Sequence, residues 1–233
     1  MSSIAATSET INELKTEIQN KISTTERGLS TTKIQEENIE DLLQKLETKC
    51  PLSEPARSSL MGGKWIVDYT TSPSPSNGKL GPFVGYARQI IDLEKGTYVN
   101  YLSVPGDIEK EWLSATLEAT FSEWDGTFLK DDRVKGEDDV DIVPVDDDLK
   151  RNDDNDVSSP NNIFSIFQDL FTLKANVKKS TNVDYGADSW KVEFQTLTIK
   201  AFGFQLIKKE FENISRIWKM SYLDEETRIG KFI

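Results

Sequence analysis

The chain has 233 residues, 36% of them hydrophobic, and a formal net charge of −12 at pH 7. An acidic chain does not fit general nucleic-acid binding, which needs a basic surface, and no run approaches the roughly 18 apolar residues of a membrane span. A single cysteine, Cys50, and the absence of histidine exclude an internal disulfide and remove the commonest general base and metal ligand.

Two amphipathic helices are predicted near the N-terminus, in residues 10–23 and 32–49. Each opens with a threonine that stands three residues before a Glu or Gln, which is the spacing of a capping box, and apolar residues then recur at helical intervals. These apolar stripes either bind a partner or pack on each other and on a neighbouring sheet. We favour packing, because it is the usual role of an amphipathic stripe.

Alternating apolar and polar residues follow, and this period of two predicts β-strands. The clearest pattern runs through residues 113–122. Further strands are expected at residues 65–71, 87–93, 98–104, 190–200, 202–208 and 214–223. Repeated short strands separated by turn signals indicate an antiparallel barrel or sandwich.

Residues 131–156 differ in kind from the rest of the chain. They hold twelve acidic residues, four basic residues and no aromatic residue. Such a segment buries too little apolar surface to offset the entropy of ordering it, so we predict a solvated, disordered loop. Its aspartates offer oxygen ligands for Ca²⁺, but the glycine of an EF-hand spacing is absent, and we favour a loop without a specific metal.

An apolar segment follows the acidic one. Residues 159–174 read SPNNIFSIFQDLFTLK, and as a helix they present one broad apolar face bearing Phe164, Phe167 and Phe171. Such a helix either lies in a membrane interface or covers the open end of a barrel. We favour the lid, because the polar face carries little of the Lys and Arg that draws a helix to lipid.

Two segments at opposite ends of the strand region resemble a known family. Residues 62–78 read GGKWIVDYTTSPSPSNG and residues 216–230 read RIWKMSYLDEETRIG. In this order and at this separation they resemble the opening and closing strands of the plastid lipid-associated proteins, also called fibrillins or plastoglobulins. The resemblance covers most of the chain except residues 131–162. Family members usually continue with one more short strand. Because this chain ends at GKFI, the sequence does not decide whether a last strand closes the barrel.

The resemblance implies a mainly β fold, a lipocalin-like antiparallel β-barrel preceded by an N-terminal helical segment. On this reading, residues 1–58 hold the helices and a linker, and residues 59–233 form the barrel. An acidic, disordered insert is expected at about residues 131–160.

The ends of the barrel also imply a closure. In lipocalins a Gly-x-Trp on the first strand meets an arginine near the last strand. Here Gly63 and Trp65 would meet Arg216 or Arg228, with a cation–π contact worth about 0.5–2 kcal/mol. Asp224, in the acidic turn after the closing strand, is expected to pair with Arg228.

The sequence shows no catalytic constellation, with no P-loop, no dinucleotide fingerprint and no Cys/His metal spacing. We therefore expect no enzyme, no metal and no cofactor. The resemblance implies binding or shielding of a hydrophobic molecule such as a lipid, prenylquinone or carotenoid, at thylakoids or plastoglobules of the plastid. A barrel of about eight strands can hold one small ligand. Each candidate for the cavity wall has ordinary core packing as its alternative: Trp65, Tyr69, Phe121, Phe194, Phe202, Phe204, Trp218 and Tyr222.

A rival interpretation is a structural subunit that binds a photosynthetic membrane complex and has a filled barrel with no ligand. A ligand pocket would favour the first interpretation and a solid core the second. Residues 1–8 have no arginine and no hydrophobic core, so we expect no transit peptide in this chain. A plastid protein of this sequence would be a mature form or an incomplete precursor.

Overall fold

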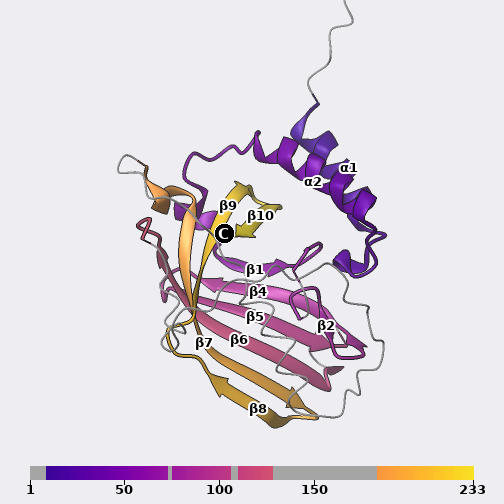
Figure 1. Cartoon of the computed structure of the whole chain (residues 1–233), viewed down its shortest axis with the longest axis vertical. Coiled ribbons are helices and arrows are strands. Elements are labelled where there is room, and N and C mark those ends of the chain that lie inside the picture. Colours follow the sequence, from indigo (N-terminus) through magenta and orange to yellow (C-terminus); the bar gives the residue numbers. More distant parts are fainter. Residues whose placement is uncertain (1–8, 73–74, 106–109, 128–182) are drawn as a thin grey trace, which may run out of the picture.

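The computed structural model describes residues 9–72, 75–105, 110–127 and 183–233. These residues form a mainly β fold, in which an N-terminal pair of helices precedes a curled antiparallel sheet (Figure 1). The expected fold class is confirmed, with the sheet curled into a half-barrel. The acidic insert and the apolar segment with Phe164, Phe167 and Phe171 lie outside the described residues.

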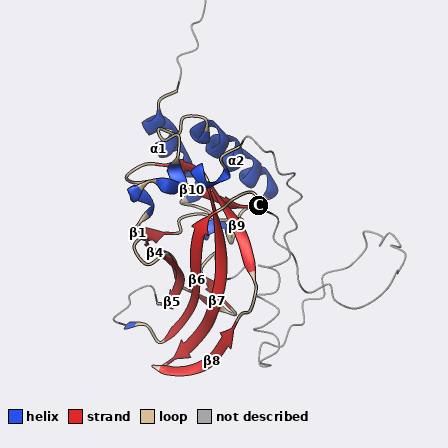
Figure 2. Cartoon of the chain, turned by 90° about the vertical axis from the view of Figure 1, so that its left-hand side faces the viewer, coloured by secondary structure: helices blue, strands red, loops and turns tan. Residues whose placement is uncertain are grey.

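The helices are α1 (Ile11–Ile22) and α2 (Lys33–Glu47), and both begin with a complete capping box. The Thr10 hydroxyl accepts a hydrogen bond from the Glu13 N–H, and the Glu13 carboxylate accepts one from the Thr10 N–H. Their buried apolar stripes pack together and against two residues of the closing strands, Tyr222 and Ile229. The helical pair therefore sits on β9 and β10, at one end of the sheet (Figure 2).

Short 3₁₀ turns flank the sheet at Glu26–Gly28, Pro55–Arg57, Ser59–Met61 and Tyr185–Ala187. The strands are β1 (Gly63–Ile66), β2 (Lys79–Leu80), β3 (Phe83–Val84), β4 (Tyr86–Asp92), β5 (Thr97–Val104), β6 (Leu113–Glu123), β7 (Ser189–Ala201), β8 (Phe204–Glu210), β9 (Ser215–Leu223) and β10 (Arg228–Phe232). Eight of them form the main sheet in the order β1-β4-β5-β6-β7-β9-β10, with β8 also paired to β7, and β2 and β3 form a separate hairpin.

On one edge, the long strand β7 pairs with two different strands along its length. Its first part, Ser189 to Glu193, pairs with β9, and its last part, from Thr196 to Ala201, pairs with β8. Irregular registers in the β6–β7 and β7–β8 pairs accompany this change of partner. Because bulges bend a strand and increase its twist, they help the sheet to curl.

The two ends of the curled sheet are β1 and β10, and each has one hydrogen-bonded neighbour among the described strands. The last residues do form a strand: Arg228 to Phe232 pair antiparallel with β9. The ending RIGKF therefore supplies a last strand, while backbone pairing among the described strands does not close the sheet into a full barrel. We call the gap between β1 and β10 the seam.

The main core lies on the inner face of the sheet. Apolar residues on neighbouring strands face each other in register there, for example Leu117 opposite Leu197 and Ala115 opposite Ile199. The alternation in β6 and β7, which shifts by one residue in β7 between Phe194 and Leu197, puts polar residues on the other face, as expected for a half-buried sheet.

Candidate functional site

The most unusual group on the inner side of the sheet is the guanidinium of Arg228, the first residue of β10. Its carbon Cζ lies 4.8 Å from the ring centre of Trp65 on β1 and 4.7 Å from that of Trp218 on β9. A cation over two indole faces makes a favourable electrostatic contact with each ring. The arginine thus bridges the seam with its side chain.

Each indole is held in place by its own contacts. The Trp65 Nε1 donates a hydrogen bond of 3.1 Å to the carbonyl of Met61, in the 3₁₀ turn just before β1. The Trp218 ring lies 6.0 Å from the ring of Trp190 and 6.2 Å from that of Phe232. The Arg228 guanidinium therefore contacts two indole rings whose positions are fixed by their own hydrogen bond or packing.

Gly230 makes room for the Trp218 ring against β10. A Cβ at residue 230 would lie 2.9 Å from Cε2 and 3.2 Å from Cδ1 of Trp218, and closer still to Nε1. The register of the β9–β10 pair also shifts between Ile229 and Gly230. The absence of a side chain at this position is what lets the indole reach Arg228.

A chain of neutral polar groups leads from Arg228 across the inner face. Nη2 of Arg228 donates to Oε1 of Gln89 on β4. Nε2 of Gln89 donates to the Tyr98 hydroxyl at 2.8 Å, and that hydroxyl donates to Oδ1 of Asn100 at 2.7 Å. Gln89 and Asn100 face each other in the β4–β5 register. The chain is therefore built from two adjacent strands.

Among the described residues, the positive charge of Arg228 has no anionic partner. No carboxylate lies within 4.0 Å of the Arg228 guanidinium in the part of the chain that the structure describes, and its Nη1 is buried without a hydrogen-bond partner. Burial lowers the pKa of Arg228 to about 10, so the side chain stays charged at neutral pH. Burial also raises the pKa of the fully buried Tyr98 above its ordinary value, so the phenol stays neutral.

The arginine over the Trp65 ring is Arg228, one of the two arginines expected there. Arg216 donates through Nη1 to the carbonyl of Ser215 at 3.0 Å. Gly63 opens β1 with φ +108°, a conformation that glycine adopts without strain.

Asp224 does not pair with Arg228, contrary to expectation. It pairs with Lys15 of α1 at 2.5 Å and accepts a hydrogen bond of 2.6 Å from the Tyr222 hydroxyl. Burial opposes ionisation of this carboxylate, but Lys15, Tyr222 and two backbone N–H groups of the turn outweigh it and lower the pKa of Asp224 to about 2. The acidic turn therefore fastens a helix to the sheet, because the β9–β10 turn directs Asp224 toward α1.

The predicted wall residues divide into three groups. Four belong to the main core or pack against it: Trp65, Phe121, Phe194 and Trp218. Tyr69 and Tyr222 pack with the helices instead. Phe202 and Phe204 are 73% and 74% exposed, so they do not line the interior.

The turn between β7 and β8 accounts for the exposed pair. Phe202 has φ +52° and Gly203 φ +81°, which makes a two-residue turn. The predicted strand 202–208 therefore begins later, at Phe204. Phe202 stacks on Trp112 with ring centres 5.5 Å apart, and Trp112 meets Phe83 edge-on at 4.7 Å. These aromatics gather outside the Arg228 site.

Sequence reasoning missed the polar chain of Gln89, Tyr98 and Asn100. A signal was present, because Gln89 stands between Ala87 and Ile91 in the alternation of β4, at a position where an apolar residue is expected. A buried polar residue on an apolar face needs a partner. The identity of that partner depended on strand register.

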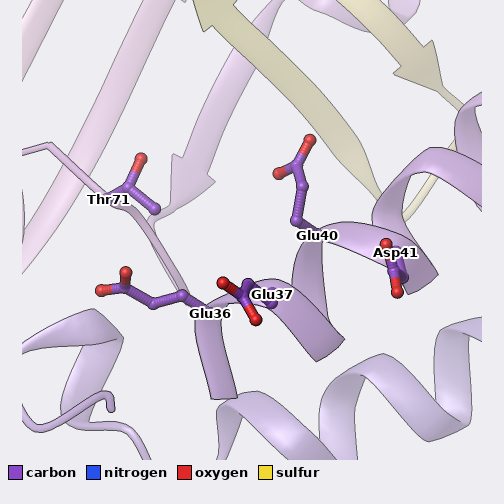
Figure 3. Close-up of a pocket in the computed structure, with 5 residues that line it drawn as sticks. All are labelled: Glu36, Glu37, Glu40, Asp41 and Thr71. Atoms are coloured by element: carbon purple, nitrogen blue, oxygen red, sulfur yellow. The ribbon is translucent and has the colours of Figure 1, made fainter. Parts of the chain in front are cut away.

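Two hollows open on the helical pair. One, of about 300 Å³, is lined by four carboxylates and a threonine: Glu36, Glu37, Glu40, Asp41 and Thr71 (Figure 3). The other, of about 370 Å³, runs along α1 beside Asn12, Glu13, Thr16, Glu17 and Asn20. Polar linings of this kind do not suit a lipophilic molecule. Within the described ranges, no group of three His, Cys, Asp or Glu side chains has the arrangement of a metal site.

Among the described helices, none combines the length and the hydropathy of a membrane-spanning segment. A family model, PAP_fibrillin, matches residues 12–232. No curated protein and no solved structure gives a significant match.

Proposed function

The chain belongs to the PAP_fibrillin family of plastid lipid-associated proteins, and from this premise we propose that it binds or shields a hydrophobic small molecule in the plastid. The ligand class is a lipid, a prenylquinone or a carotenoid. The protein acts without catalysis and associates peripherally with thylakoids or plastoglobules. Membership of the family implies a plastid location, and the residues of the chain support the binding role.

The observation that carries this proposal is the aromatic wall inside the curled sheet. The rings of Phe121 and Trp190 stack at 3.9 Å, and Trp218 continues the wall toward Tyr98 with ring centres 5.1 Å apart. Removing apolar ligand surface from water against such rings contributes about 25 cal/mol per Å² to the free energy of binding. Trp190, Trp218 and Tyr98 are 2%, 4% and 0% exposed, so a tail reaches these rings by displacing the side chains that cover them.

The seam offers a route to that wall. Between β1 and β10 the described strands are joined by the side chain of Arg228, through Trp65 and Gln89, and not by a backbone ladder. Side-chain contacts can part and re-form without breaking strand pairing. Entry at the seam therefore costs less than opening a closed barrel would.

The titration behaviour of the site supports a role without acid–base catalysis. A general acid or base works best when its pKa is near the working pH. Tyr98 and Arg228 titrate far above neutrality, and the other members of the polar chain, Gln89 and Asn100, are amides. The group is suited to hold a ligand, not to exchange protons with it.

One observation favours the rival proposal, a structural subunit of a photosynthetic membrane complex with a filled barrel. Two hollows among the described residues open on the helices and not on the aromatic wall. In that case the helical pair is the partner surface. The two proposals differ in one measurable property, the capacity of the interior to take up a small molecule.

Tryptophan fluorescence tests that capacity, because a quinone quenches indole emission at short range. We expect a benzoquinone with a decyl tail to quench the emission saturably, and the Trp218→Phe variant to lose part of the quenched amplitude. Trp124→Phe is the matched control: both indoles are 4% exposed, but Trp124 packs on Tyr185, with ring centres 4.8 Å apart.

Quenching that rises linearly with quinone concentration and never saturates would contradict the proposal. Mass spectrometry of lipids that co-purify with the natively isolated protein gives an independent readout. A filled barrel predicts neither saturable quenching nor a stoichiometric lipid. Saturable quenching equally reduced by Trp124→Phe and Trp218→Phe would place the ligand away from the aromatic wall.

A further inference from the structure

We propose that Arg228 is a head-group site, and that the interior takes an amphiphile with an anionic oxyacid head, a carboxylate or a phosphate. This inference rests on the proposed function, since it assigns the polar end of the hydrophobic ligand. The tail lies along the aromatic wall, and the head meets the guanidinium at the seam.

The first argument is charge. A buried cation is costly unless it is paired, and no carboxylate of the described residues is within ion-pair distance of Arg228. The neighbouring polar groups, Gln89, Tyr98 and Asn100, are neutral. The two indole rings compensate the charge only in part. An anionic ligand would supply the missing counter-charge.

The second argument is hydrogen bonding. The Arg228 guanidinium uses Nη2 for Gln89, while its Nη1 is buried with no partner among the described residues. Unpaired buried donors are rare in folded proteins. A guanidinium presents its donors in a planar fork that fits a carboxylate or phosphate with two parallel bonds. The unused donors match an oxyacid.

The third argument is the balance of hydrogen-bond donors and acceptors in the polar chain. The Oε1 of Gln89 is occupied by Arg228, and the Oδ1 of Asn100 is occupied by Tyr98. Each amide oxygen already accepts one hydrogen bond within the chain of polar groups and keeps a second lone pair, whereas the guanidinium brings five N–H donors and no acceptor. Donors are in excess at this site, which again favours a ligand rich in acceptor oxygens.

The surface arginine Arg57 shows the contrasting arrangement. Its guanidinium lies 2.8 Å from the Glu123 carboxylate and 2.7 Å from that of Asp184, and its donors are distributed between them. The charge of Arg57 is therefore compensated by its own neighbours in the fold. Arg228 receives none from the described residues.

The test compares head groups on one tail, using the whole chain and titration calorimetry below the micellar concentration. The probes are dodecanoate, dodecyl phosphate, methyl dodecanoate and inorganic phosphate. We expect at least one of the two anionic amphiphiles to bind about 10- to 100-fold more tightly than the ester, as for a charged hydrogen-bonded pair. The better of the two identifies the head as carboxylate or phosphate.

Two Arg-to-Gln variants then locate the effect. Arg228→Gln should lose the preference for the anionic head and keep the affinity for the ester, which also shows that the variant is folded. The control Arg88→Gln changes the residue before Gln89, on the opposite face of β4, where Arg88 donates to the Ser103 hydroxyl at 2.9 Å. It should leave both affinities unchanged.

The outcomes separate this inference from the function on which it rests. Equal binding of ester and anions by the wild-type chain overturns the head-group site and leaves the container intact. Binding of no amphiphile overturns both. Inorganic phosphate that binds as tightly as dodecyl phosphate overturns the amphiphile and indicates a free-anion site. If Arg228→Gln does not fold, Arg228→Lys, which keeps the charge, must retain a preference for the anions.

Discussion

Replacing Gly230 by alanine tests whether the packing of Trp218 against β10 holds the site together. On a strand, alanine is no worse than glycine by backbone propensity, and Gly230 is not among the residues with positive φ. The sign of the effect is therefore decided by space alone. The new Cβ would stand 2.9 Å from Cε2 of Trp218, far inside van der Waals contact.

The indole has little freedom to move away. It is 4% exposed and packs against Trp190, Phe232 and the Arg228 guanidinium. Forcing a methyl group into such packing costs about 1–3 kcal/mol, and displacing the ring from the cation adds about 0.5–1 kcal/mol. We expect Gly230→Ala to lower the free energy of unfolding by about 2–4 kcal/mol.

Urea unfolding followed by circular dichroism measures this loss, and a double-mutant cycle assigns it. In a Trp218→Leu background the ring is gone, so Gly230→Ala should cost less than about 0.5 kcal/mol, and the two changes should be strongly non-additive. Additive costs would refute the reasoning, because they would place the effect of the methyl group somewhere other than the Trp218 ring.

Three further measurements follow from the structure and the sequence, and a fourth tests the apolar segment. Trp65→Ala should lower the free energy of unfolding by about 2–3 kcal/mol, less than for a fully buried aromatic because Trp65 is only partly buried; an unchanged melting temperature would contradict this. The pKa of Asp224 is lowered to about 2 in the folded chain, below the ordinary carboxyl value, so its stabilisation is complete above about pH 4 and disappears as the pH falls toward 2. Melting temperature plotted against pH should therefore fall more steeply below pH 4 for the wild type than for Asp224→Asn, and parallel curves would count against it. Replacing residues 131–156 by a short Gly/Ser linker should leave the circular dichroism spectrum and melting curve nearly unchanged, and a large loss of stability would disprove a solvated loop. Changing the three phenylalanines of residues 163–173 to serine should weaken binding of a hydrophobic probe and spare flotation with galactolipid vesicles; the reverse result would make this segment an anchor.

Local chemistry was enough to predict the helices and most strands. Thr10 and Thr32 begin their helices as the capping-box spacing indicates, because a cap depends on residues three positions apart. The pattern of β6 was equally readable, since a period of two sustained over residues 113–122 is typical of a half-buried strand and does not fit a helix. The family itself was recognisable from two segments at opposite ends of the sheet.

Long-range geometry was not readable in the same way. Alternation groups Phe202 with Phe204, but a two-residue turn placed between them separates the pair and leaves both exposed. The partner of Arg228 was expected to be Asp224, its neighbour in sequence. The contact with Trp65, about 160 residues away, was expected from the resemblance. The hydrogen bond to Gln89, about 140 residues away, was not, because only strand register brings Gln89 to the arginine.

The attachment of the helical pair to β10 has a consequence for local stability. Lys231 of β10 pairs with Glu40 at 2.8 Å and with Glu47 at 3.0 Å, and Ile229 shares a small core with both helices. These contacts add the docking of the helices to the pairing with β9 that holds β10 in the sheet. In hydrogen exchange, the amides of β10 should open together with those of α2, so the free energy of opening the seam is set by the docking of the helices as well as by Arg228.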